Sequence, residues 1–99
     1  MTGQFSSPFY RAEATAALIV QPLDAMTLIF QRRSGITHIV AEPVPQILAV
    51  MGDAPCNADL IVARLSAQFD LGEAKAAREI IAARLEELEK LGLVDRVNA

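Results

Sequence analysis

The stretch at residues 30–40 reads FQRRSGITHIV, and this stretch decides the fold. It joins two apolar runs, at residues 26–31 and 36–41, through the polar turn at residues 32–35. Gly35 favours a tight turn there because glycine adopts positive φ angles without a Cβ penalty. On both sides of the turn, β-branched and aromatic residues occupy roughly alternating positions, which is typical of half-buried strands. The sequence therefore predicts a β-hairpin with helices packed on one of its faces.

The residues around this hairpin predict the other strands. Three strands are expected before the helices, at residues 16–21, 26–32 and 36–41. Pro22 ends the first of them, because proline cannot donate a hydrogen bond within a central strand. Gly92 suits the C-terminal end of a helix, and residues 93–97 after it predict a short terminal strand. The expected fold class is α+β.

Three helices are predicted by apolar residues at helical spacing. The first begins near residues 42–43, and its apolar stripe comprises Val44, Ile47, Leu48 and Met51. Asn57 is expected to cap the second helix, whose apolar face comprises Leu60, Ile61, Leu65 and Phe69. The third covers about residues 72–91, and Asp70 with Glu73 resembles a capping box at its start. Its stripe comprises Ala77, Ile81, Leu85 and Leu88, with Leu91 as its expected end.

Length and charge limit the function classes. The chain has 99 residues, which is enough for one domain with one core, so we expect a single domain over residues 1–99. The polar residues 1–8 are expected to be flexible. With 9 basic and 12 acidic residues the net charge is −3, which disfavours nucleic acid as a partner because its binding relies on neutralising phosphates. No apolar run approaches the roughly 18–20 residues of a membrane span, so no membrane association is expected.

The N-terminus and the cysteine content predict a cytoplasmic protein. The first residues lack a basic region followed by an apolar core, so no signal peptide is expected. The single cysteine, Cys56, excludes an internal disulfide framework and fits a reducing compartment.

Residues that carry chemistry are few. His38 is the single histidine and lacks the partners of a zinc site or a general base, so a structural role is favoured. Cys56 is expected to be a buried structural cysteine rather than a nucleophile. Arg32 and Arg33 either lie in a solvated turn or anchor an acidic peptide or enzyme surface. We therefore expect no catalytic residue, no metal and no cofactor, and the protein is predicted not to be an enzyme.

Two segments carry a family resemblance. Residues 30–48 read FQRRSGITHIVAEPVPQIL, and residues 57–71 read NADLIVARLSAQFDL. Together they resemble the PqqD-like family of small peptide chaperones, in the branch described as the HPr-rel-A system PqqD family. That branch shows a hydrophobic-Phe-x-Arg-x-Ser-Gly-x-Thr-His-hydrophobic run before a proline-led helix. The run is formed here by Ile29, Phe30, Arg32, Ser34, Gly35, Thr37, His38 and Ile39.

The resemblance, which covers about residues 24–71, implies a fold and a function. The fold is winged-helix-like, with three N-terminal β-strands followed by three α-helices and a short C-terminal strand. The function is that of a RiPP recognition element, which captures the leader of a ribosomal precursor peptide by β-strand addition and presents it to a modifying enzyme. In this branch that enzyme is expected to resemble an HPr kinase.

The same resemblance implies a peptide-binding groove between the third strand and the third helix. By analogy the groove uses Thr37, His38, Ile39, Val40 and Ala41 from the strand. From the helix we assign Ala77, Arg78, Ile81, Arg84 and Leu85. An open strand edge supplies main-chain donors and acceptors for affinity, and side-chain pockets supply specificity.

Two alternatives stay open. Residues 85–97 (LEELEKLGLVDRV) resemble the junction of recognition helix and wing in winged-helix DNA-binding transcriptional regulators. The glutamates of this helix disfavour that function, because they would meet DNA phosphates. The second alternative is a self-associating interaction domain that forms a homodimer through the third helix.

Overall fold

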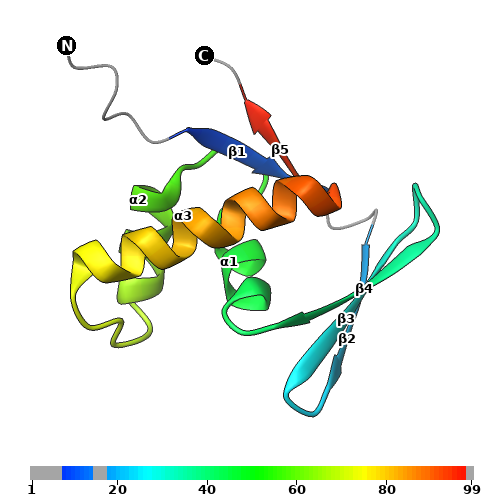
Figure 1. Cartoon of the computed structure of the whole chain (residues 1–99), viewed down its shortest axis with the longest axis horizontal. Coiled ribbons are helices and arrows are strands. Elements are labelled where there is room, and N and C mark those ends of the chain that lie inside the picture. The colour runs from blue at the N-terminus through cyan, green and yellow to red at the C-terminus, as the bar shows by residue number, and fades with distance from the viewer. Residues whose placement is uncertain (1–7, 15–17, 98–99) are drawn as a thin grey trace.

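The structure is a computed structural model and describes residues 8–14 and 18–97. Five strands and three helices follow one another along these residues (Figure 1). In chain order they are β1 (Phe9–Ala12), β2 (Leu18–Leu23), β3 (Met26–Gln31), β4 (Ile36–Ala41), α1 (Val44–Met51), α2 (Ala58–Ser66), α3 (Ala74–Leu91) and β5 (Val94–Val97). The predicted α+β class is confirmed, but four strands rather than three precede the helices. No helix in the described ranges is both long enough and apolar enough to cross a membrane.

The predicted hairpin is confirmed as β3 and β4. The two strands pair antiparallel, with Gln31 opposite Ile36 next to the turn. Gly35 has a φ of 74°, and its N–H donates to the carbonyl oxygen of Gln31 at 2.8 Å. Because β2 pairs with the other side of β3, the sheet is a three-stranded meander in the order β2-β3-β4.

The first predicted strand needs a correction at its end. The sequence predicts that Pro22 ends the strand, but β2 continues to Leu23, with Pro22 opposite Thr27 on β3. The proline is tolerated because β2 is an edge strand, and an edge strand can lack an N–H on its outer side. Residues 16–17 of the predicted strand lie outside the described residues.

β1 is a strand that the sequence analysis missed. It pairs antiparallel with β5, with Phe9 opposite Val97. Tyr10 is buried and exchanges two backbone hydrogen bonds with Cys56, of 2.8 and 2.9 Å. The chain ends are therefore tied to the loop between α1 and α2. Of residues 1–8, which are expected to be flexible, residues 1–7 lie outside the described part of the chain.

The second helix begins as predicted but ends earlier. The side chain of Asn57 accepts from the N–H of Leu60 at 2.9 Å, which confirms it as the cap of α2. The helix ends at Ser66, so Phe69 lies beyond it and is exposed, and Leu60 also faces solvent. Neither side chain belongs to the buried face.

The capping box predicted for the third helix is wrong. Gly72 has a φ of +73°, which a right-handed helix excludes, so α3 begins only after it, at Ala74. The carboxylate of Asp70 accepts from the N–H of Gly72 at 3.0 Å instead of capping the helix. The C-terminus behaves as predicted, because Gly92 caps α3 in the left-handed conformation.

One face of the meander packs against the helices. Ile29 lies opposite His38 on this inner face, and both are buried. The core joins Ile29 and Val40 of the sheet to apolar side chains of all three helices and β5. Ile39 points to the opposite, outer face and is 65% exposed. Figure 1 shows both ends of the meander extending beyond the helices.

Candidate functional site

The outer edge of β4 is open. Within the described residues, β4 has a strand neighbour on one side only, namely β3. Its sequence, ITHIVA, contains neither a charged residue nor a proline. Natural edge strands are usually protected by charges, prolines, bulges or covering segments. The strand at the opposite edge, β2, contains Pro22. β4 has neither a proline nor a charged residue and therefore presents a template for another strand.

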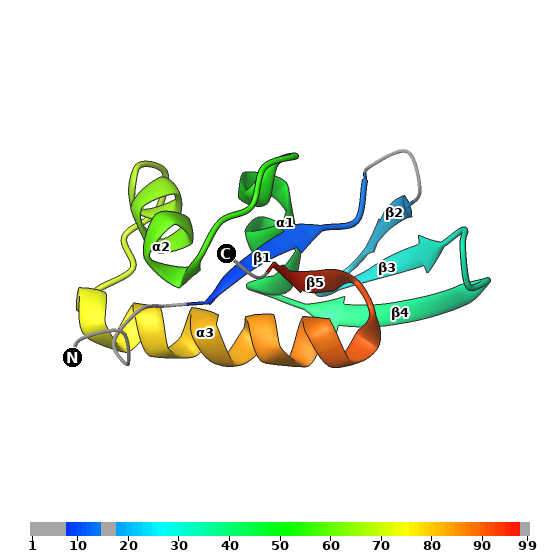
Figure 2. The same cartoon turned by 90° about the horizontal axis from the view of Figure 1, so that it is seen from above.

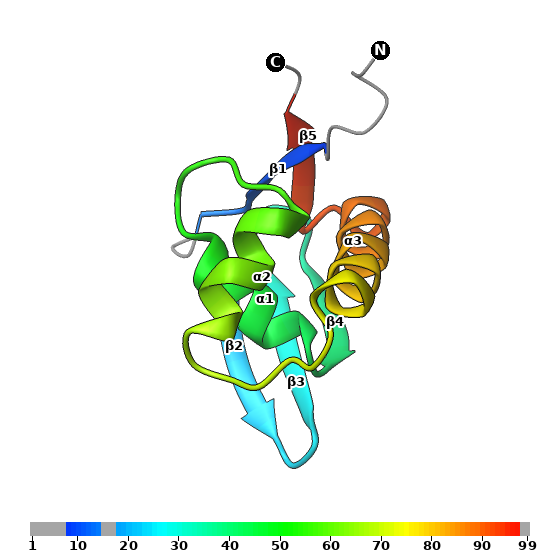
Figure 3. The ribbon, with the colours of Figure 1, turned by 90° about the vertical axis from the view of Figure 1, so that its left-hand side faces the viewer.

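A groove lies between this edge and α3. Figures 2 and 3 both show α3 running beside β4. The groove has a volume of about 230 Å³ and is lined by Ile39, Val40, Ala41, Glu42, Val44, Arg84, Glu87, Leu88 and Leu91. Strand, helix and the start of α1 therefore contribute walls to one concave surface.

Arg84 is the cation of the groove. Its Nη2 lies 2.9 Å from Oε2 of Glu87, one turn further along α3. Its Nε is shielded from solvent and has no hydrogen-bond partner among the residues that the structure describes. A buried donor without an acceptor is costly, and a main-chain carbonyl entering the groove would satisfy it.

A second hollow continues from the groove. It has a volume of about 480 Å³, shares Ala41 and Glu42 with the groove and reaches the turn between β2 and β3. Gln46 lines it and donates through Nε2 to Glu42 at 3.2 Å, while its buried Oε1 has no partner. An unpartnered donor in the groove is thus accompanied by an unpartnered acceptor in the adjoining hollow.

The residues predicted on β4 lie at the open edge or beneath it. Ile39, Val40 and Ala41 line the groove. Thr37 is exposed on the same outer face as Ile39. His38 points to the inner face, is 9% exposed, and has a buried Nε2 without a partner.

The residues predicted on α3 fall into two groups. Arg84 lines the groove. Ala77, Ile81 and Leu85 belong to the buried face of the helix, so their side chains are not available to the groove. Arg78 lies near α2, where its Nε is 2.6 Å from the carboxylate of Asp59.

The sequence analysis missed Glu87, Leu88 and Leu91 as groove residues. The predicted apolar residues come from the stripe that packs into the core. The groove face lies beside that stripe on the helix. A signal for this face exists in the sequence. Ile80, Arg84, Glu87 and Leu91 are spaced i, i+4, i+7 and i+11, so they share one side of the helix. Ile80 and Leu91 are apolar yet 54% and 45% exposed, so exposed apolar residues flank the charged pair Arg84 and Glu87 on this side.

The hairpin turn is tied to the body of the protein. Nη2 of Arg33 lies 3.2 Å from Oε1 of Glu13, so this guanidinium already has a carboxylate partner. Arg32 is exposed. Of the two arginines predicted as possible anchors for an acidic surface, Arg33 is engaged in the ion pair with Glu13, and Arg32 takes no part in that pair.

Cys56 has the environment of a structural thiol. It is completely buried, and burial raises the pKa of its thiol, an effect that the positive charge of Arg64 partly offsets. A raised pKa keeps the sulfur protonated and weakly nucleophilic. No cluster of three or more histidine, cysteine, aspartate or glutamate side chains suited to a metal ion occurs among the described residues.

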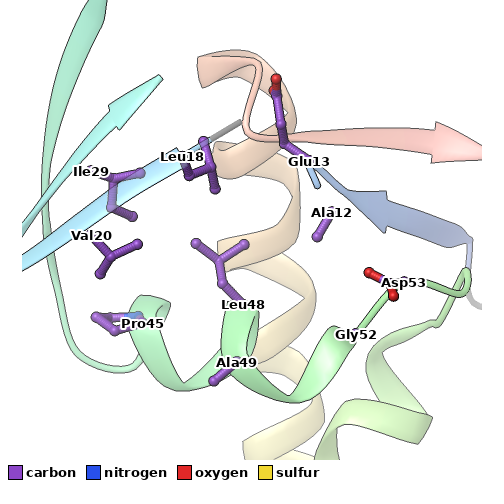
Figure 4. Close-up of a pocket in the computed structure, with 10 residues that line it drawn as sticks. All are labelled: Ala12, Glu13, Leu18, Val20, Ile29, Pro45, Leu48, Ala49, Gly52 and Asp53. Atoms are coloured by element: carbon purple, nitrogen blue, oxygen red, sulfur yellow. The ribbon is translucent and has the colours of Figure 1, made fainter. Parts of the chain in front are cut away.

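An apolar pocket lies at the other edge of the sheet (Figure 4). Its volume is about 220 Å³, and β2 and α1 supply Leu18, Val20, Pro45, Leu48 and Ala49 to its walls. The carboxylates of Glu13 and Asp53 lie at its border. It is separate from the β4 groove, with which it shares no residue.

Comparison of the chain with protein-family models, with curated proteins and with solved structures returns no match. The β4 edge and the groove beside it are therefore the features of this chain that bear most on its function.

Proposed function

We propose that the protein is a non-catalytic adaptor that captures the leader of a ribosomal precursor peptide and presents it to a modifying enzyme. In this proposal the fold acts as a PqqD-like, winged-helix-like RiPP recognition element of the cytoplasm. The observation that carries the proposal is an edge strand, β4, which has neither charge nor proline and lies beside a groove walled by α3.

The groove suits a peptide in extended conformation. A peptide strand beside β4 gains main-chain hydrogen bonds from the open edge. Its side chains alternate between the two faces of the enlarged sheet, so every second one points toward α3. Leu91, which is 45% exposed, offers apolar contact there, and Arg84 and Glu87 offer polar contact.

The outer face of the sheet supports the presentation step. Ile19, Leu23, Met26 and Ile39 on this face are all large, apolar and exposed. Exposed apolar patches of this kind mark protein-binding surfaces. A strand added beside β4 extends this face, so an enzyme that docks on it contacts the adaptor and the captured peptide together. The resemblance to the HPr-rel-A branch favours an enzyme similar to HPr kinase.

Selection of binders from a display library of random peptides tests the capture step. Ile39→Lys places a charge on the edge without disturbing the core, because Ile39 is 65% exposed, and charged edge residues oppose strand pairing. We expect this change to weaken binding of the selected peptides by at least about tenfold, equivalent to about 1.4 kcal/mol. Isothermal titration calorimetry measures the loss.

Ile19→Lys is the matched control, since Ile19 lies on the same outer face but on β2, the opposite edge. It should bind the selected peptides as the unchanged protein does. Equal binding by the Ile39→Lys and Ile19→Lys proteins would refute capture at β4.

Self-association through the same edge is the second candidate function. Because ITHIVA carries no charge, two copies of β4 can pair antiparallel without opposing like charges. This observation favours a homodimer through β4 over one through the third helix. No comparable observation favours DNA binding, since the exposed positions of α3 include Glu79, Glu86 and Glu87.

A further inference from the structure

The side chain of Gln31 joins three separate parts of the chain. It is 2% exposed and lies at the end of β3. Its Nε2 donates to Oε1 of Glu13 at 2.6 Å and to the carbonyl oxygen of Gly92 at 3.0 Å. Its Oε1 accepts from Oγ of Ser34 at 2.7 Å. The buried amide of Gln31 thus uses both its donors and its acceptor in one partly buried cluster.

Each partner of Gln31 has a further contact. Oε1 of Glu13 also faces Nη2 of Arg33 at 3.2 Å, and Oγ of Ser34 accepts from the N–H of Ile36, the first residue of β4, at 3.2 Å. We call Gln31, Glu13, Arg33 and Ser34 the hairpin clasp. The clasp links the turn before β4 to the segment after β1.

The clasp also reaches the end of α3 that walls the groove. Gly92 is the C-terminal cap of α3, and the N–H of the next residue, Leu93, donates to the carbonyl oxygen of Leu88 at 3.0 Å. Leu88 and Leu91 line the groove. The bond from Gln31 to Gly92 therefore connects the end of β3, which pairs with the start of β4, to the residue that caps α3.

We infer that Gln31 is a positioning residue that sets the distance between β4 and the last turn of α3, and with it the width of the groove. The inference rests on the proposed function only for the use of the groove. A hydrogen-bonded cluster that is fully satisfied holds its elements in one arrangement. An amide is suited to this position because it donates to a carboxylate and a carbonyl at once, which neither a leucine nor a glutamate can do.

The width of the groove is measured on the protein without any peptide. The quantity observed is the paramagnetic relaxation enhancement of backbone amide signals in solution. A nitroxide is attached to Lys90→Cys, an exposed position in the last turn of α3, in a Cys56→Ala background. The label broadens the amide signals of residues 37–40 across the groove. Gln31→Leu removes the three hydrogen bonds of the Gln31 amide while leaving a side chain of similar size. We expect the broadening at residues 37–40 to fall by about half or more, because the hairpin opens locally.

Asn57→Ala is the control for a loss of stability alone. It removes the cap of α2, which is remote from the clasp, and should leave the broadening at residues 37–40 unchanged. Broadening that is unchanged in the Gln31→Leu protein, or that falls equally in the Asn57→Ala protein, would overturn the inference.

Ser34→Ala keeps the test decisive if Gln31→Leu does not fold. Ser34 is exposed, and its loss leaves Oε1 of Gln31 without its donor, so a smaller decrease of the same broadening is expected. No decrease would contradict the clasp. Because no peptide is present, failure of this test is distinct from failure of peptide capture, which the Ile39→Lys titration measures.

Discussion

Neighbouring residues of α3 differ in their surroundings because one side of the helix packs in the core and another lines the groove. Leu85 is 1% exposed and packs in the core, whereas Leu91 is 45% exposed and lines the groove. Arg84 directly precedes Leu85 in the helix, yet its side chain lines the groove. A core residue, Leu85, and an exposed groove residue, Leu91, thus lie only a few positions apart in the helix.

Alanine substitutions separate these two tasks. Leu85→Ala should lower the free energy of unfolding by about 2–5 kcal/mol, since it leaves a cavity in the core. Leu91→Ala should change it by less than about 0.5 kcal/mol, as exposed positions usually do, yet weaken binding of the selected peptides. Urea unfolding and calorimetric titration measure the two quantities. If Leu91→Ala destabilised the fold as much as Leu85→Ala, the groove face of α3 would be assigned wrongly.

The spacing of apolar residues in the sequence identifies the core face of α3, but it does not show which element lies beside the groove face. Helical spacing identifies Ala77, Ile81, Leu85 and Leu88 as one stripe, and these residues are buried. The spacing alone cannot show that β4 lies beside Arg84, because that neighbour comes from a distant part of the chain. For the same reason Gln31 attracts no notice in the sequence, although its partners Glu13 and Gly92 make it a junction of the fold.

At the scale of elements, the β3–β4 hairpin is the part that local sequence determines most fully. Gly35 and the alternating residues around it lie close together in the chain, so the turn and both strands are predicted. β1 is missed because its four residues pair with β5, at the far end of the chain. The start of α3 is misplaced because the positive φ of Gly72, rather than the spacing of Asp70 and Glu73, decides where the helix begins.

The open edge of β4 also predicts self-association of the free protein. Sedimentation equilibrium should give an apparent mass that rises with concentration above the monomer mass of 10.7 kDa. Ile39→Lys should keep the protein monomeric, because a charge on each edge then opposes pairing, and Ile19→Lys should not. A monomer mass for the unchanged protein at every concentration would argue against this use of the edge.

At the scale of the whole molecule, the arrangement separates a stable body from an accessible edge. The helices and the β1–β5 ribbon form the body (Figure 1), and the core joins both to the inner face of the meander. β4 lies at the border, with its inner face in the core and no strand of the described residues paired to its outer edge. Such an edge can accept a peptide without rearranging the core, which is what an adaptor needs.

Residue-resolved amide hydrogen exchange tests strand addition at β4 most directly. The protein is measured by NMR with and without a peptide taken from the display selection. In an antiparallel pair, successive residues of a strand direct their N–H groups alternately to either side. Strand addition therefore predicts that every second amide of Ile36–Ala41 exchanges more slowly in the complex, while the amides bonded to β3 change little. Slower exchange confined to β2 or the helices, with the amides of β4 unchanged, would contradict capture by strand addition.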